Sequence, residues 1–239
     1  MPSDSIRAIL NWSGGKDSCF ALSRCGQERI EICGLLTTLH QDMDLGSSKS
    51  SGSRVSHHEV SEELITAQAR SLGLPLKTVI LPANPSDKIY SATMEQSLQA
   101  FSAEGISDAV FGDIFLEDLR SYREQRLNSI GWKAHFPLWK RDTKNLARDF
   151  IAAGFRAIVV SVDLSRLDAG FCGRMFDTQF LDDLPDDVDA CGEYGEFHTF
   201  VYGGPLFRRP VEFTTAGFRE MSYALGQSQH RFVYCELAA

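Results

Sequence analysis

The chain reads Ile-Leu-Asn-Trp-Ser-Gly-Gly-Lys-Asp-Ser from Ile9 to Ser18, and this stretch decides its fold. An apolar, strand-like run leads into a glycine turn, and the Cys-Phe-Ala-Leu run that follows is typical of the first turns of a helix. A strand that feeds a glycine turn and then a helix presents free backbone N–H groups and the positive end of the helix dipole. The sequence therefore predicts a site for an anion such as a phosphate at this turn.

The side chains of the turn suit a phosphate and its metal ion. Gly14 and Gly15 let the backbone approach a phosphate without a Cβ in between. Lys16 supplies a mobile cation, and Asp17 offers the kind of oxygen ligand that Mg²⁺ shares with phosphates. The turn is not a mononucleotide P-loop, which needs four residues between its first glycine and Gly-Lys-Ser/Thr.

Composition narrows the classes of protein. The chain has 24 Lys and Arg against 32 Asp and Glu, so its net charge of −8 disfavours general binding of nucleic acid. None of its 6 cysteines forms a Cys-x-x-Cys pair, so we expect reduced thiols rather than a zinc ribbon or a disulfide scaffold. No N-terminal signal and no apolar run of the ~18 residues that a membrane span needs are found, so we expect a soluble, cytoplasmic protein.

Strand-like and helix-like segments alternate up to about residue 160. The strand-like segments are 6–12, 31–39, 75–81, 108–114 and 157–162, and the helix-like ones are 16–26, 60–73, 87–104, 116–128 and 142–153. This alternation predicts a doubly wound parallel sheet of the α/β class, with right-handed crossover helices. Ligands of such sheets lie at the carboxyl ends of the strands, where Thr37, Gly112 and Asp113 fall. Residues 44–56 predict a surface loop, whose position also suits a flap over substrate.

The pattern becomes less regular after residue 160. We expect a first domain at residues 1–160 and a smaller α+β lobe at 161–239, whose informative run is Gly-Glu-Tyr-Gly-Glu-Phe-His-Thr at 192–199. In a strand, Glu196 and His198 would share a face, and a bulge at Gly195 could bring Glu193 to it. Such a cluster can bind or deprotonate an ammonium ion or hold a metal, whereas a solvated polar hairpin is the alternative interpretation.

The loop at 13–18 resembles the pyrophosphate loop of the N-type ATP pyrophosphatases. Together with the run at 192–199 and the blocks at 111–114, 136–139 and 203–207, it makes nearly the whole chain similar to the diphthine–ammonia ligase family. The resemblance implies an adenine nucleotide α-hydrolase (HUP-type) fold with a smaller substrate lobe. It also implies ATP, Mg²⁺, an adenylated carboxylate and ammonia as the attacking group, with release of AMP and pyrophosphate.

One block departs from the family. Ligases that act on the diphthine of elongation factor 2 usually carry Glu-Tyr-Glu-Thr where this chain has Glu-Phe-His-Thr at 196–199. The His-Thr form is similar to bacterial relatives, and bacteria lack diphthamide. The resemblance therefore implies the chemistry more directly than the substrate, which we expect to be a small-molecule or protein-borne carboxylate. A homodimer is compatible with the sequence.

The resemblance implies a role for each candidate residue. The loop holds the β and γ phosphates, Lys16 neutralises the leaving pyrophosphate, and one of Glu193, Glu196 and His198 holds or deprotonates ammonium. Asp17, with help from Asp113, holds Mg²⁺. The remaining nucleotide-binding candidates are Ser13, Gly14, Gly15 and Ser18 for the phosphates, Gly112 beside them and Thr37 for the adenine pocket.

Two other functions fit the same fold. An enzyme of tRNA thiolation or modification would need a reactive cysteine and a basic surface, and the sequence offers neither clearly. A non-catalytic ATP-binding module would bind the nucleotide without turnover. Lys16, Asp17 and the glutamates of the second lobe argue against such a module.

Overall fold

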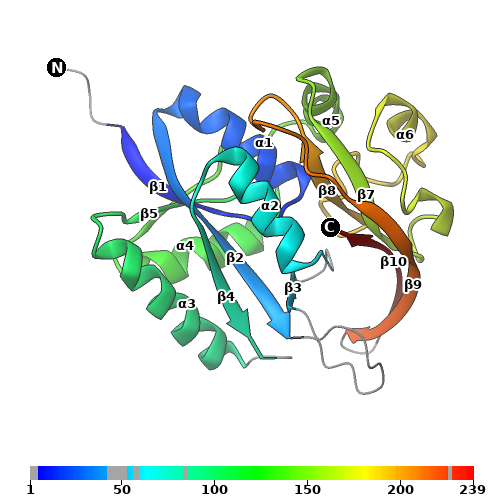
Figure 1. Ribbon diagram of the computed structural model, residues 1–239. Coiled ribbons are helices and arrows are strands. Elements are labelled where there is room, and N and C mark those ends of the chain that lie inside the picture. The colour runs from blue at the N-terminus through cyan, green and yellow to red at the C-terminus, as the bar shows by residue number, and fades with distance from the viewer. Residues whose placement is uncertain (1–4, 42–52, 56–59, 83–85, 226–227) are drawn as a thin grey trace.

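Two β-sheets organise the chain, one formed by its N-terminal part and one by its C-terminal part (Figure 1). The computed structural model describes residues 5–41, 53–55, 60–82, 86–225 and 228–239. In this part of the chain, no helix is long and apolar enough to cross a membrane.

The first sheet has β1 at its centre. Five strands run parallel in the order β4-β2-β1-β5-β6, namely β4 (Leu76–Leu81), β2 (Ile30–Gln41), β1 (Ile6–Asn11), β5 (Asp108–Val110) and β6 (Lys133–His135). The short β3 (Ser53–Val55) pairs antiparallel with the end of β2. The chain builds outward from β1 to β4 on one side and then returns to β5 on the other, so the topological switch point lies between β1 and β5.

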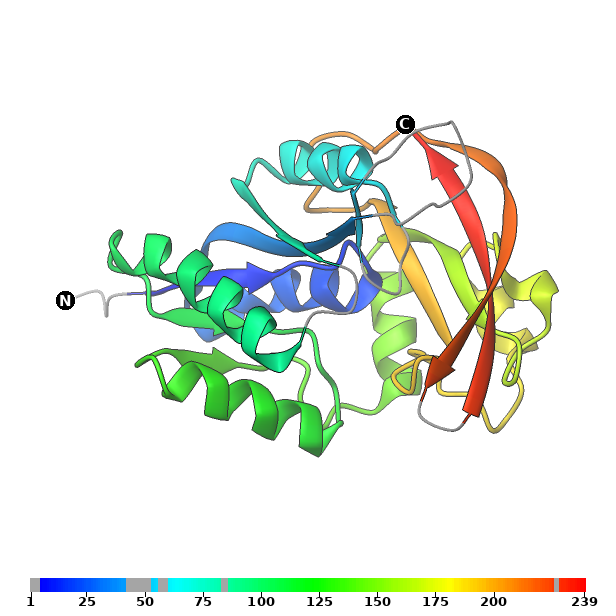
Figure 2. The same ribbon diagram turned by 90° about the horizontal axis from the view of Figure 1, so that it is seen from below.

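Helices cover both faces of this sheet (Figure 2). Successive side chains of β1 point to opposite faces. Ala8 and Leu10 share a core cluster with α1 (Lys16–Cys25), α2 (Glu62–Leu72) and α5 (Thr143–Ala152). Ile9 belongs to a second cluster with α3 (Asp87–Ser102) and α4 (Glu117–Asn128) on the other face. The doubly wound parallel sheet predicted from the sequence is confirmed.

The helix ends follow local sequence signals. Asp142 caps α5, and its Oδ1 accepts a hydrogen bond of 2.8 Å from the backbone nitrogen of Asn145. Ser61 caps α2 in the same way, and Gly73 ends α2 with a φ of +73°, which favours glycine. A short 3₁₀ turn, η1 (Gly26–Glu28), follows α1.

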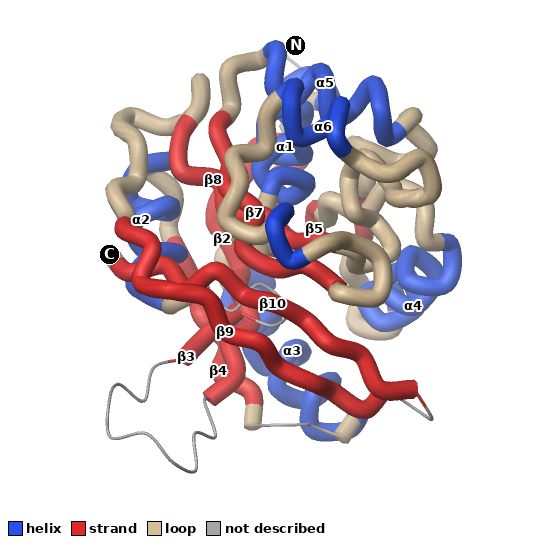
Figure 3. The backbone as a smooth tube through the Cα atoms, turned by 90° about the vertical axis from the view of Figure 1, so that its right-hand side faces the viewer, coloured by secondary structure: helices blue, strands red, loops and turns tan. Residues whose placement is uncertain are grey.

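The second sheet is antiparallel, and the long hairpin of β9 and β10 forms one side of it (Figure 3). Its strands, in the order β8-β7-β10-β9, are β8 (Phe197–Gly203), β7 (Arg156–Asp163), β10 (Ser228–Ala238) and β9 (Thr214–Leu225). The connection from β7 to β8 contains η2 (Ala169–Phe171) and α6 (Thr178–Asp183). It packs on the sheet through aromatic contacts such as that of Phe180 with Phe197, whose ring centroids are 5.2 Å apart.

The division at residues 160 and 161 stays a proposal, and the sheets favour an earlier place for it. β7 was expected in the first domain, but it pairs antiparallel with β8 and β10 in the second sheet. Its side chains are buried from Ala157 to Asp163 on both faces, a pattern that suits a parallel strand and a central antiparallel strand equally well. Most of the segment 44–56, where we expect a loop or flap, lies outside the described residues. The described part of this segment is β3.

Candidate functional site

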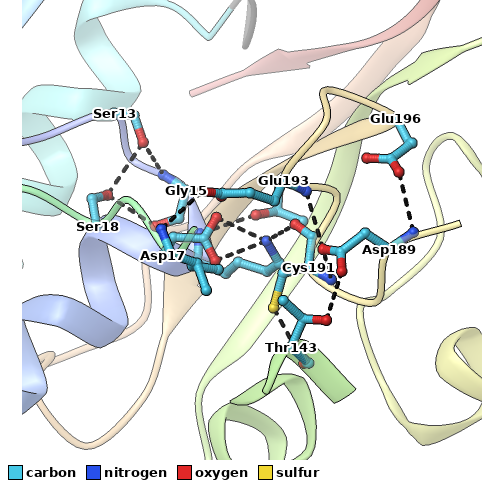
Figure 4. A network of polar contacts seen from close by, with 12 residues as sticks. Ser13, Gly15, Asp17, Ser18, Thr143, Asp189, Cys191, Glu193 and Glu196 are labelled. Carbon is cyan, nitrogen blue, oxygen red and sulfur yellow. Dashed lines mark hydrogen bonds and ion pairs between the residues drawn. The ribbon is translucent and has the colours of Figure 1, made fainter. Parts of the chain in front are cut away.

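The loop between β1 and α1 has a fixed backbone. Gly14 has a φ of +81°, and a Cβ there would come within 2.8 Å of Oε1 of Gln68, so glycine is required. The Ser13 hydroxyl accepts a hydrogen bond of 3.2 Å from the Gly15 nitrogen, and the Ser18 hydroxyl donates one of 3.0 Å to the Gly15 oxygen (Figure 4). The hydroxyls of Ser13 and Ser18, which we expect to contact phosphates, therefore hold the backbone of the loop in shape.

The end of β5 lies directly against the start of α1. A Cβ on Gly112 would stand 2.7 Å from the carbonyl carbon of Asp17, so only glycine allows this approach. The next residue, Asp113, points its carboxylate at Arg123, with 2.6 Å between the Arg123 Nε and the carboxylate. The guanidinium of Arg123 lies over the ring of Phe111, 4.4 Å from its centroid. Gly112 and Asp113 thus border the loop, with the charge of Asp113 already paired.

Lys16 is buried, with 4% of its side chain exposed, and joins the two lobes. Its Nζ donates to the Asp17 carboxylate at 2.8 Å and to the carbonyl oxygen of Cys191 in the second lobe. The rings of Phe176 and Phe197 lie 5.7 and 5.5 Å from Nζ. Burial is the largest influence and lowers the pKa of Lys16, but Asp17, Cys191 and Glu193 together outweigh it, so the pKa lies above its ordinary value and the side chain stays an ammonium.

The strand β8 of the second sheet docks on the loop. The Thr199 hydroxyl accepts a hydrogen bond of 3.0 Å from the Lys16 backbone nitrogen. The Val201 nitrogen donates one of 2.9 Å to the carbonyl oxygen of Gly14. The amide of Gln68, in α2, donates to the carbonyl oxygens of both Gly14 and Val201. The loop is therefore completed by the C-terminal part of the chain.

Glu193 bridges the lobes a short way along the same seam. Its Oε1 accepts hydrogen bonds from the backbone nitrogens of Ile114 at 2.8 Å and Phe115 at 3.3 Å. Burial raises the pKa of Glu193 to about 7, with a further contribution from Asp17, although the two backbone donors act in the opposite direction. A carboxyl with such a pKa can accept and release a proton near neutrality.

Glu196 organises the loop that carries Glu193. Its carboxylate is buried, with 1% of the residue exposed, and accepts a hydrogen bond of 3.1 Å from the nitrogen of Asp189 (Figure 4). It accepts a second, of 3.0 Å, from the nitrogen of Tyr194. Asp189 in turn accepts hydrogen bonds from the nitrogens of Cys191 and Glu193 at 2.9 and 3.2 Å. Both carboxylates thus satisfy backbone donors of a tight, irregular segment.

The structure does not bring Glu193, Glu196 and His198 onto one face. Glu196 precedes β8 and points into its own loop, while Glu193 reaches across to the first lobe. His198 lies in β8 opposite Ser161, and strand alternation places it on the face opposite Thr199. Among the described residues, no group of three or more His, Cys, Asp or Glu could hold a metal ion.

Thr37 lies beneath the loop. Its side chain is fully buried, and its hydroxyl donates a hydrogen bond of 2.8 Å to the carbonyl oxygen of Trp12. Thr37, which we expect at the carboxyl end of its strand, instead lies within β2, and this contact ties the strand to the residue that starts the loop.

A cavity of about 120 Å³ opens on the α3–α4 face of the first sheet, beside the switch point. Side chains of β1, β2 and β5 form its floor, and α3 and α4 form its walls. Its lining is mainly apolar, with polar groups at the margin, and includes Ile9, Asn11, Leu36, Tyr90, Met94, Ala109, Phe111 and Arg123. Such a cavity suits a flat, mostly apolar group.

Sequence reasoning missed Gln68, and it gave Thr199 and Asp189 no role. Gln68 falls on the apolar side of the helix predicted at 60–73, four residues after Leu64, and a polar residue in an apolar stripe is a usable signal. Thr199 stands in the quoted motif, but its partner is 183 positions away in sequence. Asp189 stands in an acidic run that gives no signal of its own.

Two family models match the chain. The diphthamide synthase N-terminal domain matches residues 6–134, and the diphthamide synthase C-terminal domain matches residues 142–226. The chain belongs to the diphthamide synthase family. The first match ends within β6 and the second begins just before α5, so both leave β7 to the C-terminal part, as the division between the two sheets does.

Curated relatives of the diphthamide synthase family carry the name diphthine–ammonia ligase. The relative from Rattus norvegicus is 25% identical over 227 residues, which cover 88% of this chain and 84% of the relative. The relative from Danio rerio is 27% identical over 227 residues, with 86% of each chain covered. The relative from Schizosaccharomyces pombe is longer, since its 26% identity over 84% of this chain covers 35% of its own length. The resemblance seen in the motifs is confirmed.

Proposed function

We propose that the chain is an ATP-dependent amide-forming ligase, which adenylates a carboxylate and transfers ammonia to it with release of AMP and pyrophosphate. One observation carries the proposal: Lys16 of the glycine loop contacts both Asp17 and the carbonyl of Cys191, two residues before Glu193. The anion site of one lobe and a carboxyl that can titrate near neutrality thus lie along one seam. The names of the relatives support the same chemistry.

ATP would lie across the switch point. Its β and γ phosphates would face the loop at 13–18 and the N-terminus of α1, where backbone donors and the helix dipole favour negative charge. Its adenine would enter the apolar cavity between α3 and α4, which borders β1 and β5. Thr37 would then support the loop from below, because its hydroxyl is already bound to Trp12.

Of the two residues expected to hold Mg²⁺, Asp17 suits that role better than Asp113. The Asp17 side chain is 31% exposed, so its carboxylate is accessible although Lys16 is bound to it. Asp113 is 12% exposed and held by Arg123. Asp17 would therefore hold Mg²⁺ together with phosphate oxygens, as is usual for this ion. The bound ion would supply electrostatic stabilisation of the phosphates.

The chemistry would take two steps. In the first, an oxygen of the substrate carboxylate attacks the α phosphorus, and the bond to the β-phosphate oxygen breaks while the Lys16 ammonium stabilises the leaving pyrophosphate. In the second, the nitrogen of ammonia attacks the acyl carbon, and the bond to AMP breaks. Glu193 would take the proton that ammonium must lose before this attack.

Glu196 and His198, the other two candidates for holding or deprotonating ammonium, would have roles different from that of Glu193. Glu196 would position the segment 189–194 rather than touch substrate, because each oxygen of its buried carboxylate accepts a hydrogen bond from that segment's backbone. His198 stays a candidate for contact with the carboxylate substrate on the opposite face of β8. The identity of that carboxylate, cytoplasmic location and a homodimer stay predictions, and light scattering would test the last.

Four buried cysteines are poorly suited to the thiolation alternative. Burial raises the pKa of Cys25 and Cys172 to about 12, and it raises that of Cys19 and Cys191 further. A thiolate is the nucleophilic form of cysteine. These four side chains are therefore poor sulfur carriers at neutral pH.

The test supplies ATP, ¹⁵N-labelled ammonium and a diphthine-bearing protein taken from cells without diphthine–ammonia ligase. The expected result is AMP, pyrophosphate and ¹⁵N in a new amide of the acceptor. ADP as the product would overturn the proposal. AMP formation without incorporation of nitrogen would leave adenylation in place and refute the transfer step.

A further inference from the structure

Gln68 lies where the loop, α2 and the second sheet meet. The residue is fully buried. Its Oε1 accepts a hydrogen bond of 2.9 Å from Nε1 of Trp12. Its Nε2 donates to the carbonyl oxygens of Gly14 at 2.9 Å and Val201 at 2.6 Å. One amide group thus contacts three segments that are far apart in the sequence.

The contact with Gly14 governs the direction of the next backbone donor. The Gly14 carbonyl receives two hydrogen bonds, one from Gln68 and one from the Val201 nitrogen. Because the peptide bond is planar and trans, the carbonyl of Gly14 and the N–H of Gly15 point in opposite directions. Holding the carbonyl therefore fixes where the Gly15 N–H points, on the side of the loop away from Gln68, where it donates to the Ser13 hydroxyl at 3.2 Å and so holds the turn in shape.

We propose that Gln68 is a positioning residue for the β and γ phosphates of ATP. It acts through Gly14, whose φ of +81° leaves the loop dependent on outside contacts to keep its shape. The inference rests on the proposed function, since it assumes that the loop holds these two phosphates. Gln68 itself touches neither phosphate.

The test compares ATP with AMP, which has no β and γ phosphates. Gln68→Met keeps the length of the side chain and removes its donors, and dissociation constants are measured by calorimetry for both nucleotides with Mg²⁺. The expected result is an ATP dissociation constant that rises at least about tenfold, the equivalent of one buried hydrogen bond, with the AMP constant changed less than about twofold. Gln68→Glu keeps an acceptor for Trp12 but not the donors, so it should give the same result.

Ser71→Ala is the matched control. Ser71 lies on the same helix, is 5% exposed, and its hydroxyl bonds to the backbone of Arg209 rather than to the loop. This variant should lose stability but keep the preference for ATP over AMP. If Gln68→Met does not fold, Gln68→Glu carries the test.

The outcomes separate this inference from the proposed function. Equal losses of ATP and AMP affinity, or no loss of either, would show that Gln68 does not position the phosphates. A wild-type protein that binds ATP no better than AMP would instead refute the phosphate site itself.

Discussion

The Glu193 carboxylate lies 2.8 Å from the backbone nitrogen of Ile114, although the two residues are 79 positions apart. Ile114 follows the end of β5, at the crevice beside the switch point, where open α/β sheets hold their ligands. The carboxylate therefore closes one edge of the crevice from the second lobe. A substitution of Glu193 should therefore change both the rate of the reaction and the stability of the folded protein.

The rate of amide formation should depend on the charge of Glu193. Because burial raises its pKa to about 7, the carboxyl loses its proton as the pH rises through neutrality. The rate should therefore increase from about pH 6 to about pH 8, as expected for a general base. Glu193→Gln should remove this rise and lower the rate at the upper end. A pH profile of nitrogen incorporation for the two proteins is the measurement, and parallel profiles would count against the role.

The raised pKa of Glu193 also affects the stability of the folded protein. The pKa of Glu193 is higher in the folded state than its ordinary value of 4.5, so ionisation costs more in the folded protein than in the unfolded one. Stability is thus fully present below that ordinary value and declines as the pH rises towards about 7. Melting temperatures of wild type and Glu193→Gln on both sides of this window are the measurement. The wild type should lose more than the variant, and an equal loss would contradict the assignment.

Removal of Lys16 should abolish most turnover. Lys16→Ala leaves Asp17 without its 2.8 Å partner and removes the cation beside the proposed pyrophosphate site. The expected loss in the rate of AMP formation is about 100-fold or more, as for other groups that stabilise developing charge. Lys144→Ala is the control, because Lys144 is an exposed lysine in the first turn of α5. Similar rates for the two variants would show that Lys16 does not act in the reaction.

A methyl group on Gly112 should displace the start of α1. In Gly112→Ala, the new Cβ would meet backbone atoms of Asp17 and Ser18 at 2.7 and 2.8 Å, and backbone cannot give way cheaply. We expect a loss of about 1–3 kcal/mol of stability together with weaker ATP binding. Gly26→Ala is the control, since its Cβ would meet nothing within 4 Å and its φ is −61°. Denaturant unfolding and calorimetry measure the two effects, and a Gly112→Ala protein that matches Gly26→Ala would refute this account.

Filling the cavity should weaken the binding of every adenine nucleotide. Met94 lines the cavity from α3, and Met94→Trp would occupy much of the space that we assign to adenine. ATP and AMP affinities should fall together, in contrast to the selective loss expected for Gln68. Ile89→Trp is the control, because Ile89 lies on the same helix and is 46% exposed. Unchanged affinities in Met94→Trp would place the base elsewhere.

The first sheet was predictable because its signals are local. Apolar runs and glycine turns each act over a few residues, and they predicted the strand β1, the loop and α1. The motif at 192–199 made Glu193 a candidate, but its hydrogen bond with the backbone of Ile114 was not predicted. Glu193 does not form the expected cluster with Glu196 and His198, because the Glu196 carboxylate instead accepts hydrogen bonds from the backbone of its own loop.

The second sheet was less predictable because its pairing is remote. A buried β-branched run such as β7 does not reveal whether its neighbours are parallel or antiparallel. The partners of β9 and β10 are set by register and by the twist of a long hairpin, not by a residue motif. Gln68 carries a signal, but its meaning depends on Gly14 and Val201, which only the folded chain brings to it.

The bond between Val201 and Gly14 has a consequence for synthesis. A ribosome releases the glycine loop early, yet β8 emerges only when most of the polypeptide has been translated. The nucleotide pocket of a nascent chain therefore stays incomplete until late in elongation, and a transcript truncated before β8 would encode a first lobe whose phosphate cradle lacks one of its walls.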